Sequence, residues 1–204
     1  MLLEINPRHP EPRKIEKVVD VLANGGIIAY PTDTYYGIGC DLFNKQSIEK
    51  IYQLKRRSTQ QPFSFICGDH TNISEYAQVT NYAYKTMKRL LPGPYTFVLE
   101  GSRLVPKIML TKQRTVGIRV PDHEICLAMV NALGHPVIST SATDPENGRA
   151  LESPQEIREV LGHALDMIVV GDPVSAKPSS VISLINDSPE VIREGIGDVS
   201  VFRS

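Results

Sequence analysis

The chain has 204 residues, of which 41% are hydrophobic and 22% are charged, and its formal net charge is −1. This composition is typical of a globular protein with a sizeable core, and the near-neutral charge gives no overall attraction to nucleic acid or to membranes. The sequence contains no run of about 18 apolar residues, so a membrane-spanning helix is not expected.

The N-terminus and the cysteines favour the cytoplasm. Residues 1–7 lack the basic start and the long apolar core of a signal peptide. Cys40, Cys67 and Cys126 are odd in number and widely spaced, which favours free thiols over disulfides or a zinc site. We therefore expect a cytoplasmic protein that does not associate with membranes.

Apolar periodicity and turn residues predict helices and strands that alternate over the first 170 residues, followed by strands alone. Predicted helices cover about residues 11–24, 45–56, 80–91, 121–133 and 153–162. Predicted strands cover about residues 27–30, 62–67, 95–99, 115–120, 136–140, 166–170, 180–185 and 191–193, and residues 103–113 fit either a short helix or a loop. This order predicts a single α/β domain over residues 1–204, whose sheet contains parallel and antiparallel strands.

The densest group of polar side chains follows the first of these strands. Pro31 ends the strand, and residues 32–36 then supply hydroxyls, a carboxylate and phenols. Gly37 and Gly39 allow close backbone approach, so residues 31–41 are predicted to form a polar, glycine-rich loop. Such a loop after a strand is where α/β folds hold their ligands, and a turn without any function is the alternative.

Cations and further polar loops complete a candidate site. Lys55, Arg57, Arg119 and Arg193 could neutralise an anionic ligand, and hydroxyls in the loops at 139–143 and 178–180 could orient it. Helix-end charges are the alternative for the first two cations, because a helix C-terminus favours positive charge. An ion pair with an acid such as Asp33 or Glu194 is the alternative for the two arginines. Phosphate-loop, dinucleotide, metal-ligand and GxSxG motifs are absent from the sequence.

The same stretches resemble the YrdC-like family of threonylcarbamoyl-AMP synthases, and within it the YciO-type branch. The matching motifs occur in family order between residues 15 and 197: YPTDTYYGIGCD (30–41), LKRR (54–57), PGPYTF (92–97), TVGIRVPDH (115–123), STSA (139–142), PSSVI (178–182) and IREG (192–195). The resemblance implies a twisted, open sheet of mixed strand direction with flanking helices, folded around a concave, positively charged cavity of the YrdC/RibB-like type.

The resemblance also implies an activity. Threonine would take up bicarbonate or CO2 as a carbamate, which attacks the α-phosphorus of ATP and gives threonylcarbamoyl-AMP and pyrophosphate. The product serves N6-threonylcarbamoyl modification of an adenosine in transfer RNA, carried out by a separate threonylcarbamoyl-transfer complex. The implied ligands are ATP, L-threonine, bicarbonate and a magnesium ion carried by ATP, and the implied partners are that complex and transfer RNA or duplex RNA.

Roles for individual residues follow from the matched motifs, with no metal ligand among them. Substrate binding is implied for Thr32, Tyr36, Arg119 and Ser179, catalysis and phosphate contact for Lys55 and Arg57, and nucleotide binding also for Ser139, Ser141 and Arg193. Of the two adjacent tyrosines, Tyr36 holds the motif position and is expected to face the ligand.

Three positions depart from the pattern of many synthases. Ser58 stands where proline follows the motif arginine, Gln61 stands where lysine or asparagine precedes the next proline, and Thr143 stands where asparagine ends the serine-rich loop. A hydroxyl offers fewer hydrogen bonds than an amide, so a weaker or altered use of substrate is expected. Two other functions stay open: a non-catalytic module that binds duplex or transfer RNA, and carbamoyl-adenylate formation from carbamoyl phosphate.

Overall fold

The structure is a computed structural model that describes residues 1–56, 63–110, 113–172, 174–175 and 177–203. Within these ranges, the strands are β1 (Leu2–Glu4), β2 (Ile28–Tyr30), β3 (Gly37–Asp41), β4 (Ser64–Ile66), β5 (Tyr95–Glu100), β6 (Thr115–Arg119), β7 (Val137–Ser141), β8 (Met167–Val170), β9 (Ser180–Ser183) and β10 (Glu190–Arg193). The α-helices are α1 (Pro12–Ala23), α2 (Lys45–Leu54), α3 (His70–Tyr76), α4 (Asn81–Leu90), α5 (Glu124–Leu133) and α6 (Pro154–Leu161).

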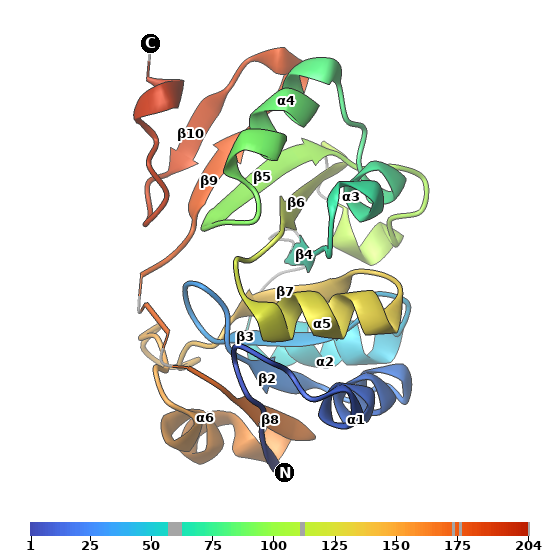
Figure 1. Cartoon of the computed structure of the whole chain (residues 1–204), viewed down its shortest axis with the longest axis vertical. Coiled ribbons are helices and arrows are strands. Elements are labelled where there is room, and N and C mark those ends of the chain that lie inside the picture. The colour runs from blue at the N-terminus through green and yellow to red at the C-terminus, as the bar shows by residue number, and fades with distance from the viewer. Residues whose placement is uncertain (57–62, 111–112, 173, 176, 204) are drawn as a thin grey trace.

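The strands of the described ranges form one sheet in the order β1-β8-β2-β3-β7-β4-β6-β5-β9-β10, which runs from the bottom to the top of Figure 1. The sheet contains both parallel pairs, such as β4 with β6, and antiparallel pairs, such as β3 with β7. The predicted fold class, an open sheet of mixed direction with flanking helices, is therefore confirmed.

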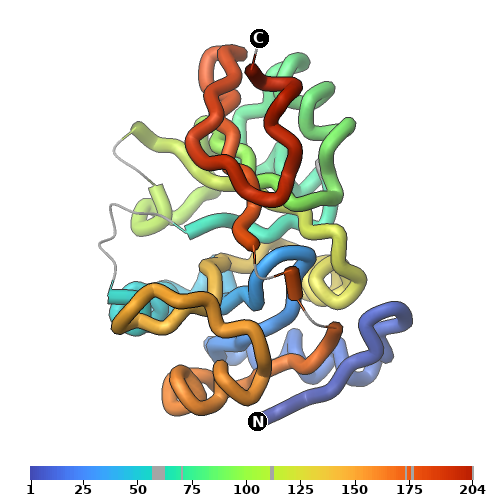
Figure 2. The backbone as a smooth tube through the Cα atoms, turned by 90° about the vertical axis from the view of Figure 1, so that its left-hand side faces the viewer, coloured from blue at the N-terminus to red at the C-terminus, as the bar shows by residue number. Residues whose placement is uncertain are grey.

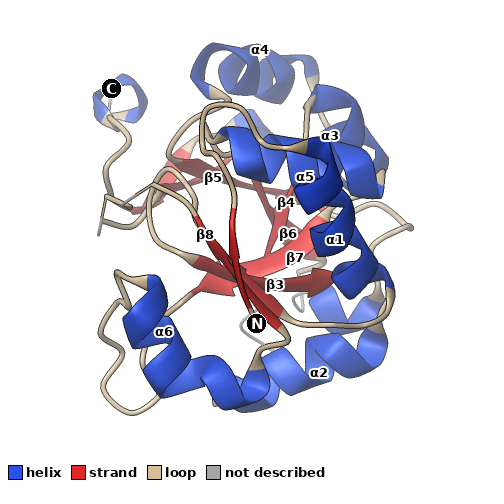
Figure 3. Cartoon of the chain, turned by 60° about the horizontal axis from the view of Figure 1, so that its bottom comes forward, coloured by secondary structure: helices blue, strands red, loops and turns tan. Residues whose placement is uncertain are grey.

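Helices cover both faces of the sheet. Ile15, Val18 and Leu22 of α1 are buried in one apolar cluster with residues of α5, β2 and β8. Buried residues of α2, α3 and α4 belong to a second cluster, which also includes residues of β3, β5 and β6. Figure 3 shows the strands in the interior, with α1 and α5 on one side and α2 and α6 on the other. The polar residues at the strand ends are thus held by a framework that is packed on both faces.

Local signals explain where several helices begin. The Asn44 side chain accepts a hydrogen bond from Ser47 N at 3.0 Å at the start of α2. Ser153 caps α6 in the same way, with Glu156 N donating to its Oγ at 3.2 Å. These caps satisfy backbone donors that have no partner inside the helix, so both predicted starts are confirmed.

The C-terminal segment of the chain packs back against strands β5 and β9. Tyr95 Oη donates to the Asp198 carbonyl at 3.1 Å, and Ser180 Oγ donates to the Gly197 carbonyl at 2.6 Å. Figure 2 shows this segment in red at the top of the molecule, whereas the N-terminus lies at the bottom. The return of the chain therefore holds β9 and the preceding residues in place.

The structure corrects the prediction that residues 31–41 form a loop. Residues 37–41 are strand β3, which pairs with β2 and β7. The glycines allow tight strand packing here: a Cβ at Gly39 would lie 2.7 Å from the Ile138 carbonyl oxygen and 3.0 Å from Tyr30 Cε1. The short elements β1 and α3 were also not predicted.

The thiols agree with the expectation from composition. Cys40, Cys67 and Cys126 are free and buried, so the prediction of free thiols is confirmed. Burial raises the pKa of Cys40 to about 12, which leaves this thiol protonated at neutral pH. No helix within the described ranges has the length and apolar character needed to cross a membrane.

Candidate functional site

A polar cavity of about 720 Å³ is lined by residues of β4, β5, β6, β7, β9 and β10 and of the loops next to them. Its described lining comprises mostly hydroxyl-bearing, cationic and small apolar residues: Tyr35, Lys55, Phe63, Ser64, Ile66, Thr96, Val98, Gln113, Thr115, Val116, Gly117, Arg119, Ser139, Thr140, Ser141, Thr143, Asp144, Pro145, Gly148, Ser179, Val181, Ile192 and Arg193. Lysine and arginine outnumber acids three to one in this lining, because Asp144 is its sole carboxylate. The cavity therefore suits an anionic ligand.

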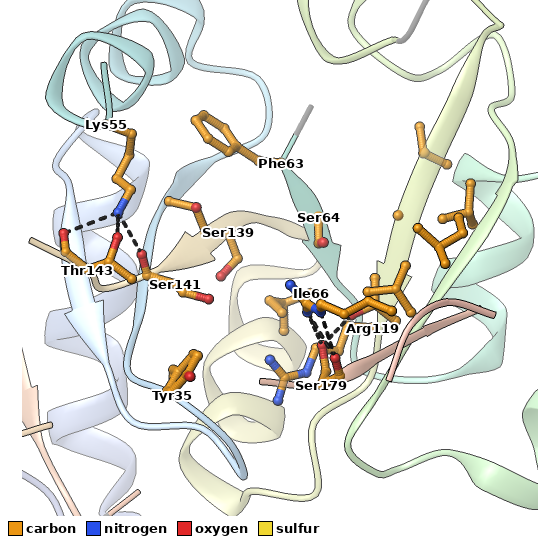
Figure 4. A pocket seen from close by; sticks show the side chains of 18 of the residues that line it. Tyr35, Lys55, Phe63, Ser64, Ile66, Arg119, Ser139, Ser141, Thr143 and Ser179 are labelled. Carbon is orange, nitrogen blue, oxygen red and sulfur yellow. Dashed lines mark hydrogen bonds between the residues drawn. The ribbon is translucent and has the colours of Figure 1, made fainter. Parts of the chain in front are cut away.

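Lys55 forms one side of the cavity, directly after helix α2. Its ammonium donates to the carbonyl oxygens of Ser141 at 3.1 Å and of Thr143 at 3.2 Å, and also to Thr143 Oγ1. Figure 4 shows these three bonds on the left. Lys55 thus connects the end of α2 with the end of β7. Its ammonium group contacts protein oxygens in the wall of the cavity and does not point into bulk water.

Arg119 forms the opposite side, at the end of β6. Its Nη2 forms an ion pair with Asp33 and donates to Thr34 Oγ1 at 2.6 Å. The side chains of Arg119 and Asp33 are each 11% exposed, so the pair is largely shielded from water. The ion pair proposed from sequence as an alternative for Arg119 is therefore present, and the same arginine also lines the cavity.

Ser179 and Arg193 lie on the Arg119 side of the cavity. Arg193 donates to the Ser179 carbonyl from Nε at 3.1 Å and from Nη2 at 2.9 Å. The hydroxyls of Ser179 and Thr96 lie 2.9 Å apart and share a hydrogen bond. Glu194, which sequence offered as a partner for the arginines, pairs with Arg203. The network thus joins β5, β9 and β10 next to the cavity.

Ser139 is fixed from beneath by a buried phenol. Tyr30 Oη donates to Ser139 Oγ at 2.6 Å. Burial raises the pKa of Tyr30, so the phenol keeps its proton and acts as the donor. Gly37 makes room for this bond, because a Cβ there would lie 2.8 Å from Tyr30 Cζ and 3.1 Å from Ser139 Oγ.

The structure brings together most of the residues predicted for the site. Lys55, Arg119, Ser139, Ser141, Ser179 and Arg193 all line the one cavity, although they come from separate parts of the chain. Arg57, with the departures Ser58 and Gln61, lies outside the described residues. The chemical roles assigned to all of these residues remain predictions.

Thr32 and Tyr36 are not among the described residues that line the cavity, and their roles in substrate binding stay predictions. Thr32 is 3% exposed, and its Oγ1 donates to the Tyr35 carbonyl at 2.5 Å and accepts from Thr34 N at 3.1 Å. Tyr36 is 1% exposed, and it is the neighbouring Tyr35 that faces the cavity. Residues 33–35 form a bend just before β3 begins at residue 37, so the motif position alone does not determine which of the two tyrosines lines the cavity.

Sequence reasoning missed several lining residues that strand alternation could have found. Thr115 and Gly117 share the cavity face with Arg119 on β6, and Thr96 and Val98 share it on β5. Side chains two positions apart lie on the same face of a strand, so placing Arg119 in the site would have placed the first two there as well. Thr143 was noted only as a departure, whereas in the structure it contacts Lys55.

Fold and cavity together define an α/β protein whose open mixed sheet surrounds a cation-lined site. The model of the Sua5/YciO/YrdC family, described as "Telomere recombination", matches residues 20–195. This match covers most of the chain, and the chain therefore belongs to the Sua5/YciO/YrdC family.

Two curated relatives match over nearly their whole length. The chain is 39% identical to the uncharacterized protein YciO of Escherichia coli (strain K12) over 199 residues, which cover 97% of each chain. It is 33% identical to a putative threonylcarbamoyl-AMP synthase of Methanocaldococcus jannaschii over 203 residues, which cover 96% of this chain and 93% of that one. The family likeness inferred from the motifs is thus confirmed.

Solved structures agree with this placement. The crystal structure of E. coli YciO superimposes with a TM-score of 0.93 at 37% identity and covers 99% of this chain and 98% of that one. The crystal structure of P. abyssi Sua5 complexed with L-threonine gives a TM-score of 0.88 at 25% identity, covering 96% of this chain and 57% of that one. The fold is therefore shared with a protein that binds an amino acid.

Proposed function

We propose that this chain forms threonylcarbamoyl-AMP and pyrophosphate from L-threonine, bicarbonate or CO2, and ATP. The observation that carries the proposal is the convergence of Lys55, Arg119 and Arg193 with serine hydroxyls on one cavity of about 720 Å³. This volume lies within the range of about 300–1,000 Å³ that is usual for small-molecule sites. Relatives named threonylcarbamoyl-AMP synthase and a relative complexed with L-threonine support the choice of reaction.

The reaction proceeds in two bond-forming steps. The threonine amine forms an N–C bond with CO2 and loses a proton, which gives a carbamate. A carbamate oxygen then attacks the α-phosphorus of ATP, the bond to the bridging oxygen of the β-phosphate breaks, and pyrophosphate leaves with the electron pair. None of the steps needs a covalent bond to the protein, so the chain contributes by positioning both reactants and neutralising charge at phosphorus.

The geometry supports a division of the cavity into two sides. Arg119 and Ser179 would hold the threonine carboxylate and its neighbouring groups, because a guanidinium suits a carboxylate geometrically. Lys55, with Arg57, would meet the phosphates as charge builds up during attack. The hydroxyls of Ser139 and Ser141, with Arg193, would contact the nucleotide.

Thr32 and Tyr36 contribute indirectly under this proposal, because both are buried and neither is among the described lining residues. Thr32 accepts a hydrogen bond from Arg119 Nη2 at 3.4 Å, and Tyr36 adjoins Tyr35, which lines the cavity. Their effect on substrate binding would therefore pass through the residues that they hold.

Magnesium would enter the site on the triphosphate of ATP and offset part of its charge. The described residues contain no group of three or more His, Cys, Asp or Glu side chains that could hold a metal ion. The donor set therefore fits a metal held mainly by phosphate oxygens, as is common for magnesium in nucleotide sites. The protein groups named above would then bind the oxygens that the metal leaves available.

The deciding experiment measures pyrophosphate release and identifies the nucleotide product by mass, with each reactant omitted in turn. The proposal predicts release only when ATP, threonine and bicarbonate are all present, together with a product of the mass of threonylcarbamoyl-AMP. Release that needs carbamoyl phosphate in place of bicarbonate would instead support the related carbamoyl-adenylate reaction. Salt-sensitive retention of transfer RNA or duplex RNA without any turnover would support an RNA-binding module.

The destination of the product has a separate test. Addition of the threonylcarbamoyl-transfer complex and an unmodified transfer RNA to the reaction should yield threonylcarbamoyl-adenosine in the RNA. Product that forms but is not passed on would restrict the proposal to the synthase step.

A further inference from the structure

Asp33 makes two contacts that join separate parts of the chain, although it does not line the cavity itself. One carboxylate oxygen pairs with Arg119 Nη2. The other accepts a hydrogen bond from Asp122 N at 3.2 Å, just before helix α5. Both oxygens are therefore engaged, so the carboxylate has a fixed orientation between the β2–β3 connection and the end of β6.

Arg119 uses only one of its three nitrogens for these contacts. Within the described residues, its hydrogen bonds to Thr32, Asp33 and Thr34 all come from Nη2. Nε is buried and has no hydrogen-bond partner there, and no bond is formed by Nη1 either. When a planar guanidinium is held through one nitrogen, the N–H groups of its other two nitrogens can donate to a further acceptor.

The burial of the pair gives the contact its strength. At 11% exposure, neither charge is well solvated, so the removal of one leaves the other without compensation. A guanidinium without Asp33 would be free to rotate away towards water. The same movement would change how the guanidinium of Arg119 meets the cavity that this residue lines.

We propose that Asp33 is a positioning residue that holds Arg119 through Nη2 and thereby presents the remaining guanidinium nitrogens to the carboxylate of the amino-acid substrate. Thr34, whose Oγ1 accepts from the same nitrogen at 2.6 Å, assists in this role. The inference rests on the proposed function for the identity of the carboxylate. It goes further by naming a residue outside the cavity lining that determines affinity for one substrate and not for the other.

The test compares Asp33→Asn, which removes the charge and keeps the shape, with Asp33→Glu, which keeps the charge. Asp33→Asn should raise the threonine concentration needed for half-maximal turnover by about tenfold or more, and should change the ATP requirement by less than about twofold. Asp33→Glu should recover part of the threonine affinity. A purely structural role would lower the melting temperature and the active fraction without separating the two substrates.

Two further variants keep the test decisive. Thr34→Val leaves the ion pair intact, so it should fold even if Asp33→Asn does not, and it should weaken threonine binding by about threefold. Asp41→Asn is the matched control, because Asp41 is a similarly shielded acid, 14% exposed, that pairs with His135 and lies outside the cavity lining. It should leave both substrate requirements as in the unsubstituted chain.

Calorimetric titration of threonine into the protein without ATP separates this inference from the proposed function. Threonine binding that is weakened by Asp33→Asn would support the inference even if the chain forms no adenylate. Normal turnover in the unsubstituted chain together with unchanged threonine affinity in folded Asp33→Asn and Thr34→Val would overturn the inference and leave the function standing.

Discussion

The two sides of the cavity hold their cations in different ways. Arg119 pairs with the carboxylate of Asp33, and both side chains are shielded from water. Lys55 donates to carbonyl and hydroxyl oxygens of Ser141 and Thr143, which carry no formal charge. A shielded ion pair fixes a planar guanidinium, whereas an ammonium on a flexible stem exchanges one neutral acceptor for another more readily. In the contacts described, Arg119 is thus held by an ion pair and Lys55 by neutral oxygens.

The difference matches the two reactants of the proposed reaction. An amino-acid carboxylate does not change during carbamate attack, so it is best held by a group that does not move. The phosphates gain and redistribute charge as the bond to the leaving group breaks, so a cation such as Lys55 that can follow them is better placed there. Substitutions on the two sides should therefore affect different kinetic parameters.

The largest expected effect is on the Lys55 side. Lys55→Ala and Arg57→Ala should each reduce nucleotide turnover by about tenfold or more, which is about 1.4 kcal/mol or above at the transition state. The loss should appear in kcat, because the charge is needed most when phosphorus is attacked. Lys50→Ala is the matched control, because Lys50 is an exposed lysine on α2, the helix that precedes Lys55. Unchanged turnover in both site variants would remove the phosphate role.

The next effect tests the Arg119 side. Arg119→Lys keeps the charge but loses the planar arrangement that can serve Asp33, Thr34 and a ligand together. It should raise the KM for threonine by about tenfold while kcat and the KM for ATP change by less than about twofold. Steady-state kinetics with each substrate varied in turn measures this. An equal rise in both KM values would contradict a separate amino-acid side.

A smaller effect is expected at Thr143. Thr143→Val removes the hydroxyl acceptor of Lys55 but leaves the two carbonyl acceptors, so turnover should fall by only about threefold. Thr143→Ser keeps the hydroxyl, so its turnover should lie closer to that of the unsubstituted chain. A loss as large as that of Lys55→Ala would mean that Thr143 itself contacts the ligand.

The smallest effect concerns stability and pH. Burial holds the pKa of His123 below its ordinary value of 6.5, and its Nδ1 is buried without a hydrogen-bond partner among the described residues. Below pH 6.5 the unfolded chain takes up a proton that the folded chain binds more weakly, so stability is lost as the pH falls from 6.5 towards the folded pKa. Chemical denaturation at several pH values should show that the free energy of unfolding falls less steeply with falling pH in His123→Gln than in the unsubstituted chain. The same dependence of the unfolding free energy on pH in both proteins would contradict this role.

Sequence patterns predicted the order of most elements because helix faces, caps and proline stops act locally. Asn44 and Ser153 begin their helices as expected. Strand β3 was missed because Gly37 and Gly39 are typical of loops, and only the approach of Tyr30 and Ile138 in the folded sheet explains why glycine is needed there. Local propensity was overridden by tertiary packing.

Motif positions predicted which residues of the site lie at the cavity. They did not predict the cases in which the direction of a side chain determines whether the residue lines the cavity. Lys55, Arg119 and Arg193 were expected at one ligand, and all three line the cavity. Residues 33–35 form a bend before β3, so the motif position alone did not indicate that Tyr35, and not Tyr36, lines the cavity. The partners of Lys55 could not be foreseen, because its bonds reach residues more than 80 positions away.

The central claim is that one cavity between Lys55 and Arg119 binds both reactants, and a crystal structure with threonine and a non-hydrolysable ATP analogue tests it most directly. The account predicts density for both molecules in this cavity, with the threonine carboxylate at Arg119 and the phosphates at Lys55. Both ligands bound elsewhere on the molecule, or the carboxylate at Lys55 and the phosphates at Arg119, would contradict it.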